Sequence, residues 1–161
     1  MDIQLVKIKQ CELKSAWLMQ KIGFIDIFLK YFDIISPVLQ GYTRFVKKAN
    51  CVDMYWILMN GKKAGEIWIG ERDGICYIAN LFVLKKYRNK GVAQRVITLA
   101  EDLYPRHNVW RLDTIKQEKA NCHLYEKLGY IPAGVEKKIN KRMTIIDYEK
   151  RKGDPNEKRN N

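Results

Sequence analysis

The sequence predicts an α+β fold: a mixed, mostly antiparallel central sheet of about six to seven strands with helices on both faces. Two observations support this class. Three apolar, β-rich runs lie in series at residues 51–59, 63–71 and 75–84, and the hairpin-forming dipeptides Asn60-Gly61 and Asp73-Gly74 separate them. Runs with helical periodicity lie on both sides of this meander, and two further β-rich runs close the chain.

The region before the meander predicts one strand and a helical segment. Residues 2–9 alternate apolar and polar side chains, as an edge strand does. Residues 12–32 place apolar side chains at an imperfect helical spacing and predict one helix, which Gly23 could break. Residues 35–45 contain a proline and a glycine and predict a loop or a short second helix.

The region after the meander alternates helices and strands. Residues 91–104 place apolar side chains on one helical face, and Pro105 ends that helix. Gly129 is suited to cap a second helix. The elements that follow the first helix are a strand, the second helix and two closing strands, at 109–115, 118–128, 130–138 and 142–150. We expect residues 1–150 to form a single domain and residues 151–161 a flexible polar tail.

Composition narrows the class of protein. No apolar run approaches the roughly 18 residues of a membrane span, and no basic leader precedes an apolar core at the N-terminus. We therefore expect a cytoplasmic protein with no membrane partner. The four cysteines form no CxxC pair and only two histidines are present, so we expect no metal and reduced, mostly buried thiols.

The charge balance is the strongest deviation from an average composition. The formal net charge is +12, which favours anionic partners such as nucleic acid, a membrane surface or a phosphate-bearing ligand. The basic residues do not alternate with aromatic ones as on an RNA-binding platform, and no recognition-helix pattern stands out. Nucleic acid is thereby disfavoured as a partner.

The stretch YRNKGVAQRV, residues 87–96, places a basic turn directly before a helix start. A helix N-terminus offers unpaired amides and the positive end of the helix dipole, and Gly91 would let the backbone approach a ligand closely. Arg88 and Lys90 add formal charge, so a phosphate or pyrophosphate is the natural ligand. By itself the turn also fits a simple cap on a surface helix, which is the commoner structure.

Two segments resemble the motifs of one family. Arg88-Asn89-Lys90-Gly91-Val92-Ala93 resembles the [RQ]-x-x-G-x-[GA] motif of the GNAT acetyltransferase superfamily, and residues 80–87 resemble the strand before it. Asn121 to Tyr130 resembles the second motif of that family, an Asn followed by Tyr-Glu-Lys-Leu-Gly and an aromatic residue. The resemblance covers about Cys51 to Glu149 and does not reach the acceptor-binding region before it.

The resemblance implies how acetyl-CoA, the co-substrate, would bind. Its pyrophosphate would lie on the backbone amides of residues 88–93. Its pantetheine arm would pair with backbone groups around residues 81–83, where a bulge in this strand leaves such groups free. The implied cofactor-binding residues are Leu81, Phe82, Val83, Arg88, Asn89, Lys90, Gly91, Val92, Ala93 and Asn121.

Acetyl transfer to an amine needs a neutral amine, donors to the thioester oxygen and a proton for the leaving thiolate. By resemblance, Tyr125 is the general acid toward the CoA sulfur, and a backbone N–H near Val83 is the oxyanion donor. A packing role for Tyr125 is the alternative. Asn121 would contact the cofactor, or it would be an ordinary surface residue of the helix.

The general base is left open by the sequence. The strand at 75–84 has no carboxylate and no histidine, and its polar side chains include Tyr77 and Asn80, which could hold a water relay. Glu66 on the neighbouring strand could act instead, or bulk water could remove the proton. His123 is disfavoured, because its place in the helix directs it to another side than Tyr125.

The expected function is an N-acetyltransferase in which a primary amine attacks acetyl-CoA directly in a ternary complex. The acceptor is left open among a small metabolite, a peptide N-terminus and a lysine side chain. Two alternatives also stay open: a GNAT-fold protein that binds acyl-CoA without turnover, and a nucleic-acid-binding protein. A homodimer is compatible with the sequence.

Overall fold

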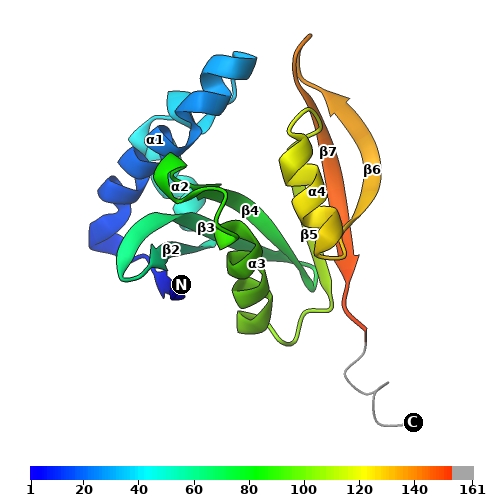
Figure 1. The fold of residues 1–161 in the computed structure, drawn as a ribbon. Coiled ribbons are helices and arrows are strands. Elements are labelled where there is room, and N and C mark those ends of the chain that lie inside the picture. Colours follow the sequence, from blue (N-terminus) through cyan, green and yellow to red (C-terminus); the bar gives the residue numbers. More distant parts are fainter. Residues whose placement is uncertain (154–161) are drawn as a thin grey trace. The chain divides into compact units, whose positions relative to one another are not determined.

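The computed structural model describes residues 1–153, and Figure 1 shows its elements. The strands in this part of the chain are β1 (Ile3–Lys7), β2 (Asp53–Met59), β3 (Lys62–Arg72), β4 (Ile75–Val83), β5 (Val109–Ile115), β6 (Ile131–Lys138) and β7 (Thr144–Arg151). Its α-helices are α1 (Leu13–Tyr31), α2 (Tyr42–Ala49), α3 (Val92–Leu103) and α4 (Lys119–Lys127). Short 3-10 turns lie at Gln10–Glu12, Pro37–Leu39 and Lys85–Tyr87.

Hydrogen bonds join the strands in the order β1-β2-β3-β4-β5-β7-β6. The β4–β5 pair is parallel, whereas the pairs β1–β2, β2–β3, β5–β7 and β6–β7 are antiparallel. The predicted α+β class, with a mixed and mostly antiparallel sheet, is therefore confirmed.

The chain divides into two compact units. The first unit comprises Met1–Gly70 and Ala79–Leu103, and the second comprises Glu71–Ile78 and Tyr104–Asn161. The single domain at 1–150 stays a prediction. Strand β7 extends to Arg151, one residue into the predicted tail, and residues 154–161 lie outside the described residues.

Both predicted hairpins are present. Asn60 and Gly61 have φ angles of 49° and 74°, and Asp73 and Gly74 have φ angles of 53° and 75°. Two successive residues in the left-handed region are what a two-residue hairpin turn requires. Each dipeptide forms one of the two turns of the meander, the first between β2 and β3 and the second between β3 and β4, and so helps to set how these strands pair.

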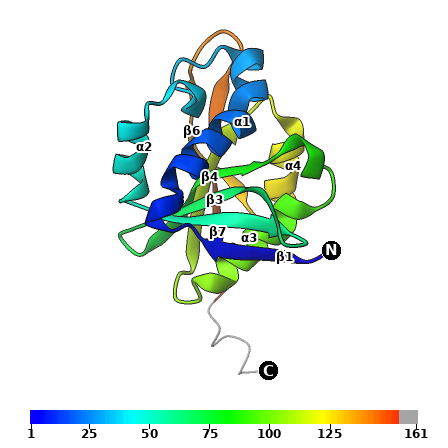
Figure 2. The same ribbon diagram turned by 90° about the vertical axis from the view of Figure 1, so that its left-hand side faces the viewer.

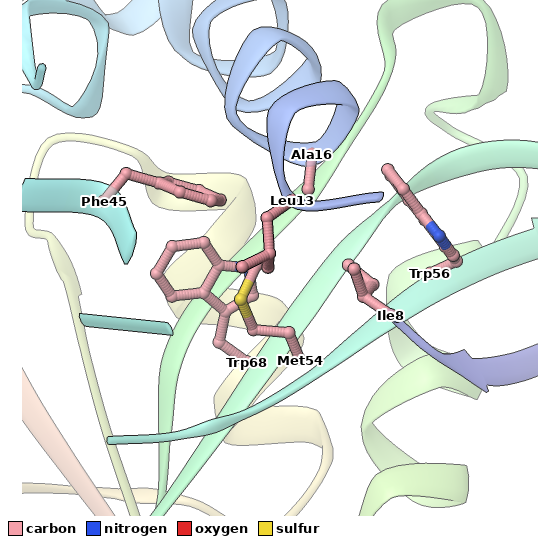
Figure 3. Close-up of a cluster of buried hydrophobic side chains, with 7 residues drawn as sticks. All are labelled: Ile8, Leu13, Ala16, Phe45, Met54, Trp56 and Trp68. Carbon is pink, nitrogen blue, oxygen red and sulfur yellow. The ribbon is translucent and has the colours of Figure 1, made fainter. Parts of the chain in front are cut away.

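The first unit has a core on the face of β2 and β3 that α1 and α2 cover. Seven buried side chains form this cluster (Figure 3): Ile8, Leu13, Ala16, Phe45, Met54, Trp56 and Trp68. The rings of Phe45 and Trp68 meet edge to face, with 5.2 Å between their centroids. An aromatic pair of this kind contributes about 0.5–1.5 kcal/mol beyond the burial of its area.

Helices cover both faces of the sheet in the first unit. Side chains alternate along a strand, so Ile67 and Ile69 point away from the face of Trp68, and both are buried. Helix α3 lies on that second face, beside β1, and buries Val96 and Ile97 completely. Figure 2 shows α1 in front of β3 and β4 and α3 behind them.

Helix α1 does not break at Gly23. The helix is continuous from Leu13 to Tyr31, and Gly23 is buried within it. A Cβ atom built on Gly23 would lie 2.2 Å from the Phe82 ring. The glycine therefore serves a close approach between α1 and β4 instead of a kink, which corrects the expectation of a break.

The second unit is built on the first half of β4 and on β5, β7 and β6. Ile75–Ile78 pairs with Val109–Leu112, and β7 lies between β5 and β6. The unit buries large aromatic side chains: Trp110, Tyr130 and Tyr148. Helix α4 ends at Lys127 with Leu128 as its C-cap, and Gly129, the next residue, has a φ of 88°, which confirms its predicted role in capping the helix.

The prediction of mostly buried thiols is only half right. Cys76 and Cys122 are buried, whereas Cys11 and Cys51 are exposed. Cys11 lies in the turn before α1 and Cys51 in the turn after α2, where no sheet or helix covers them. No helix in residues 1–153 is long and apolar enough to cross a membrane.

Candidate functional site

The end of β4 is the place where the resemblance implies a β-bulge. If the two-residue turn at Asp73-Gly74 pairs Arg72 with Ile75, regular pairing of β3 and β4 would place Val83 opposite Ala64. The Leu84 N–H, one residue later, donates to the carbonyl of Ala64 at 2.8 Å. One extra residue in β4 would produce this offset, and the bulge stays a prediction.

Phe82 marks the place where β4 departs from a regular strand. A Cβ atom on Gly65 would lie 2.0 Å from the Phe82 carbonyl oxygen and 3.0 Å from the Val83 Cα. Only glycine allows the two backbones to come this close. The Phe82 ring itself packs in the core against Phe24, with 5.3 Å between centroids, so the side chain and the backbone of Phe82 have separate roles.

The outer edge of β4 changes partner along its length. The parallel pairing with β5 joins Ile75–Ile78 to Val109–Leu112. Residues 79–83 follow the paired part of β4. They include the half-buried Leu81 and the buried Phe82 and Val83. The ladder with β5 ends at Ile78, so the backbone of residues 79–82 on this edge suits an extended ligand that adds to a strand, whereas the Val83 carbonyl accepts a hydrogen bond from Arg88 Nε.

The turn before α3 has the backbone of an anion-binding loop. Asn89 and Gly91 adopt left-handed φ angles of 59° and 71°. The Arg95 N–H donates to the Gly91 carbonyl at 3.1 Å, so the helix hydrogen bonds begin there. The N–H groups of Val92 and Ala93 then have no acceptor inside the helix. Gly91 is exposed, and a Cβ atom built on it would meet nothing within 4 Å.

Arg88 does not direct its charge into this turn. Its Nε donates to the Val83 carbonyl at 2.7 Å, and its Nη2 donates to the Gly23 carbonyl at 3.2 Å. Its Nη1 forms an ion pair with Asp26 at 3.3 Å. The backbone N–H of Arg88 donates to Lys85 at 3.2 Å. Arg88 therefore ties the turn to the end of β4 and to α1, and this differs from the expectation that its charge faces the ligand.

The exposed positive charge of the turn comes from Lys90. Its side chain is exposed, and its Nζ donates to the Lys86 carbonyl at 3.3 Å. Asn89 is exposed as well. The helix dipole of α3 adds a partial positive charge at the same place. An anion at the turn would meet backbone donors and one exposed lysine.

Glu66 carries the most deeply buried carboxyl group of the first unit. Its side chain is fully buried on β3, directly opposite Trp56 across the β2–β3 ladder. The Trp68 Nε1 donates to Glu66 Oε2 at 3.0 Å, and Oε1 has no partner among the described residues. Burial raises the pKa of Glu66 to about 8, although the bond from Trp68 and the charge of Lys63 act the other way.

The second motif forms α4 and the turn after it. Tyr125 is buried, whereas Asn121, one helical turn earlier, is exposed. The Tyr125 ring contacts the rings of Tyr130 and Tyr148, with centroids 6.2 Å and 5.9 Å apart. The Tyr130 N–H donates to the Tyr125 carbonyl at 3.0 Å and closes the turn. Packing therefore explains a large part of this motif.

The Tyr125 hydroxyl remains a proton donor over the whole physiological range. Burial raises its pKa to about 12, and the charges of Asp113 and Cys122 add to the effect. A hydrogen bond with Thr114 acts in the opposite direction. A phenol with this pKa is a weak acid, so it can donate a hydrogen bond at neutral pH far more readily than it can lose its proton.

Tyr77 and Asn80 are both half-buried residues of β4. Tyr77 lies opposite Arg111 in the β4–β5 register, and Asn80 lies beyond that register. In a regular strand, residues three apart point to opposite faces. The pleat of a regular strand therefore does not bring these two side chains together on one face.

The remaining candidates contribute little. His123 is exposed on α4, and His107 Nε2 contacts Glu71 Oε1 at 3.1 Å. Among residues 1–153, no group of three or more histidine, cysteine or acidic side chains could hold a metal ion. Two exposed carboxyl groups face each other across the β5–β7 ladder, where Asp113 pairs with Asp147. They form a local negative patch on a basic protein.

The roles of three residues near the proposed cofactor site were not predicted from the sequence. Gly23 and Gly65 shape the surroundings of Phe82, and Asp26 holds Arg88. An isolated glycine in an apolar strand is a recognised sign of close backbone approach, so Gly65 could have been found. The partner of Arg88 is 62 residues away in sequence, and no local pattern indicates it.

Comparison with known proteins agrees with this geometry. Residues 22–130 match the model of the Acetyltransferase (GNAT) family. No curated protein matches the sequence. Many solved structures share the fold.

One is the ribosomal-protein-S18-alanine N-acetyltransferase from Escherichia coli, with 15% identity, 93% of this chain and 94% of that chain covered, and a TM-score of 0.71. Another is the spermidine N-acetyltransferase from Vibrio cholerae in complex with CoA and spermine, with 15% identity, coverage of 91% and 94%, and a TM-score of 0.72. A third is the PaiA N-acetyltransferase from Thermoplasma acidophilum in complex with coenzyme A, with 15% identity, coverage of 94% and 99%, and a TM-score of 0.69. At these identities the likeness shows a common fold.

Proposed function

Because the chain belongs to the GNAT acetyltransferase family, we propose that it is an N-acetyltransferase that moves an acetyl group from acetyl-CoA to a primary amine by direct attack in a ternary complex. The observation that carries the proposal is the turn at residues 89–93. It offers two left-handed residues, an open space at Gly91 and the unpaired amides of a helix start. These are the features that a pyrophosphate group requires.

The proposed cofactor site uses mostly backbone groups. The amides of residues 89–93 would hold the pyrophosphate, with the exposed Lys90 adding a positive charge. The free edge of residues 81–83 would pair with the pantetheine arm and present the N–H near Val83 to the thioester oxygen. Arg88 acts as a positioning residue in this proposal, because its side chain is already bound to Val83, Gly23 and Asp26.

Tyr125 and Asn121 are the proposed contributions of α4. Acetyl-CoA supplies an activated thioester, and the protein must stabilise the thiolate that leaves. With a pKa of about 12, Tyr125 would stabilise a developing negative charge on sulfur chiefly as a hydrogen-bond donor. Full proton transfer to a thiolate is uphill for such a weak acid. Asn121 is exposed and would contact the cofactor.

Glu66 is the base that the geometry supports best. It has an unpartnered oxygen, and its pKa of about 8 is close to the value at which a general base is efficient near neutral pH. It also lies next to Gly65, which contacts the backbone of Phe82 in the proposed pantetheine strand. The water relay of Tyr77 and Asn80 is the second proposal for this step.

The acceptor is proposed only as a primary amine. The structural neighbours include enzymes named for a protein N-terminal alanine and for spermidine, so the shared fold does not choose between them. An amine acceptor arrives as a cation. The facing carboxyl groups of Asp113 and Asp147 are a local feature of this basic protein that would favour a cation electrostatically.

Binding of acetyl-CoA is the direct test, and the chain offers a matched pair of glycines. Gly91 and Gly61 have φ angles of 71° and 74°, and neither has an atom within 4 Å of a built Cβ. Gly91→Val and Gly61→Val should therefore impose a similar backbone strain, of roughly 1–3 kcal/mol. Isothermal calorimetry should show that only Gly91→Val loses affinity for acetyl-CoA, because its side chain fills the space of the pyrophosphate.

Equal affinity in the two folded variants would remove the phosphate cradle from the proposal. No heat and no rise in melting temperature with millimolar acetyl-CoA in the wild-type protein would remove the proposal as a whole. Binding without any release of CoA across a panel of amines would instead support a protein that binds acyl-CoA without turnover.

A further inference from the structure

Two buried oxygen atoms of the first unit are hydrogen-bond acceptors without a donor. One is Gln20 Oε1, on α1, and the other is Glu66 Oε1, on β3; neither has a partner among residues 1–153. The two side chains are only 1% and 0% exposed. Buried polar groups are nearly always paired, so two unpaired acceptors in the same unit call for a physical explanation.

Glu66 points to the face of the sheet that α1 covers. It lies directly opposite Trp56 in the β2–β3 ladder and two residues before Trp68 on its own strand. Residues at both kinds of position share one face of a sheet. Trp56 and Trp68 belong to the buried cluster that includes Leu13 and Ala16 of α1. Glu66 is therefore on the α1 side, with Oε2 bound by the Trp68 indole and Oε1 left over.

Gln20 lies on the inner face of α1, between two residues whose contacts are known. It comes four residues after Ala16 and three residues before Gly23, and these spacings keep all three on one helical face. Ala16 packs in the buried cluster with Trp68 (Figure 3). Gly23 packs against the ring of Phe82. Gln20 is thus directed at the part of the sheet between Trp68 and Phe82.

Glu66 occupies that part of the sheet. On β3 it lies between Trp68 and Gly65, and Gly65 contacts the backbone of Phe82. The same two landmarks therefore bracket Gln20 on the helix and Glu66 on the strand. The two unpaired oxygens lie at the same place in the contact between α1 and β3.

A single proton would join these two acceptors. A carboxyl group that carries its proton is a hydrogen-bond donor, and the carbonyl oxygen of a glutamine amide is an acceptor. Burial raises the pKa of Glu66 to about 8, so the group holds its proton at neutral pH. Because Oε2 already accepts a bond from Trp68, the proton belongs on Oε1.

We propose that Gln20 is a positioning residue for Glu66, and that the protonated Oε1 of Glu66 donates to Gln20 Oε1. This bond orients the carboxyl group and favours its neutral form. Lys63 acts in the opposite direction, as its charge favours the ionised form. Trp56, Phe82 and Gln20, which lie around Glu66 on β2, β4 and α1, do not titrate.

The consequence for catalysis rests on the proposed function. If Glu66 is the base, it must release the proton held toward Gln20 before it can accept one from the amine. The rate should then fall by about tenfold for each pH unit below the pKa of Glu66, which is about 8. Gln20 would set this limit without touching the substrate.

Carbon-13 NMR of the glutamate carboxyl groups in the full chain tests the pairing without an enzymatic assay. The Glu66 signal is the one that Glu66→Gln removes. Gln20→Met keeps a side chain of similar length but removes the acceptor, so the pKa of Glu66 should fall by about one pH unit. Gln40→Met is the matched control. Gln40 is also buried with one unpaired atom, but that atom is Nε2, a donor, so its loss should leave the pKa of Glu66 unchanged.

Three results would overturn the pairing: a pKa that is unchanged or higher in Gln20→Met, an equal fall in Gln40→Met, or a wild-type Glu66 that is already ionised at about pH 6. Gln20→Leu repeats the test if Gln20→Met fails to fold. In an active enzyme, the acid limb of kcat/KM should move to lower pH by the same amount as the NMR titration. A shifted NMR titration in a protein without acetyl transfer would sustain the pairing and overturn the proposed function alone.

Discussion

Replacement of Gly65 by alanine tests the closest backbone contact of the proposed cofactor site. A Cβ atom at this position would lie 2.0 Å from the Phe82 carbonyl oxygen, whereas real Cβ contacts are essentially never shorter than 3.0 Å. Strands β3 and β4 must therefore separate locally by at least about 1 Å. Overpacking of this kind typically destabilises a protein by about 1–3 kcal/mol, and a backbone obstacle belongs at the upper end.

The displacement has a functional consequence as well. The atom that must move is the carbonyl oxygen of Phe82, in the strand that we propose to pair with the pantetheine arm. We expect Gly65→Ala to weaken acetyl-CoA binding by about tenfold or more, since a 1 Å error in a backbone ligand lengthens each of its hydrogen bonds beyond the favourable range.

Gly41 provides the control. It has a φ of −69° and no atom within 4 Å of a built Cβ. Gly41→Ala should change the free energy of unfolding by less than about 1 kcal/mol. Urea unfolding measures stability, and calorimetry measures acetyl-CoA affinity. If Gly65→Ala matches Gly41→Ala in both measurements, the close approach of β3 and β4 and the role of Phe82 in binding are both wrong.

Three further predictions concern single side chains. The pKa of Glu66 is about 8 in the folded protein against 4.5 for the free group. The free energy of unfolding should therefore fall by about 1.4 kcal/mol per pH unit between about pH 4.5 and 8, and level off above that range. In urea titrations at several pH values, Glu66→Gln should lose this slope. A slope that persists in Glu66→Gln would assign it to other groups. Tyr125→Phe removes a hydrogen-bond donor to the leaving sulfur, so it should keep acetyl-CoA affinity and slow turnover by about 10²–10³-fold, with no alkaline limb lost below about pH 11. Unchanged turnover with reduced stability would show that the ring only packs. Asp26→Asn removes the partly exposed ion pair with Arg88, so the variant should lose less than about 1 kcal/mol of stability. It should also bind acetyl-CoA more weakly, because Arg88 would hold the turn less firmly. An unaffected Kd would show that Arg88 holds the turn through its carbonyl contacts alone.

The local features of the fold were predictable from the sequence because short-range physics determines them. The dipeptides Asn60-Gly61 and Asp73-Gly74 adopt the left-handed pair of φ angles that a tight hairpin needs. Gly129 ends α4 for a similar reason. Each of these features depends on the conformational freedom of one or two residues, and tertiary contacts do not change it.

Features that depend on long-range contacts were not predictable. The sequence suggested a break at Gly23, but the ring of Phe82, 59 positions later, requires a glycine there within a continuous helix. The charge of Arg88 suggested a phosphate ligand, but Asp26 and two backbone carbonyls bind its guanidinium. In both cases the partner comes from a distant segment, and the local pattern carries no sign of it.

The base also illustrates this limit. Glu66 is one of 18 acidic residues in the sequence, and its alternating strand pattern does not distinguish it from a surface carboxylate. Its burial opposite Trp56 and beside Trp68 raises its pKa, and that environment exists only in the folded first unit.

Acetyl transfer itself tests the central claim most directly. Purified protein would be incubated with acetyl-CoA and a panel of polyamines, amino acids, aminoglycosides and peptides, with free CoA measured by its thiol and the acetylated amine by mass spectrometry. The account predicts that CoA release requires at least one amine of the panel and matches the acetylated product one to one, and that Gly91→Val abolishes both while Gly61→Val retains them. CoA release that is independent of any amine, or equal activity in the two variants, would contradict it.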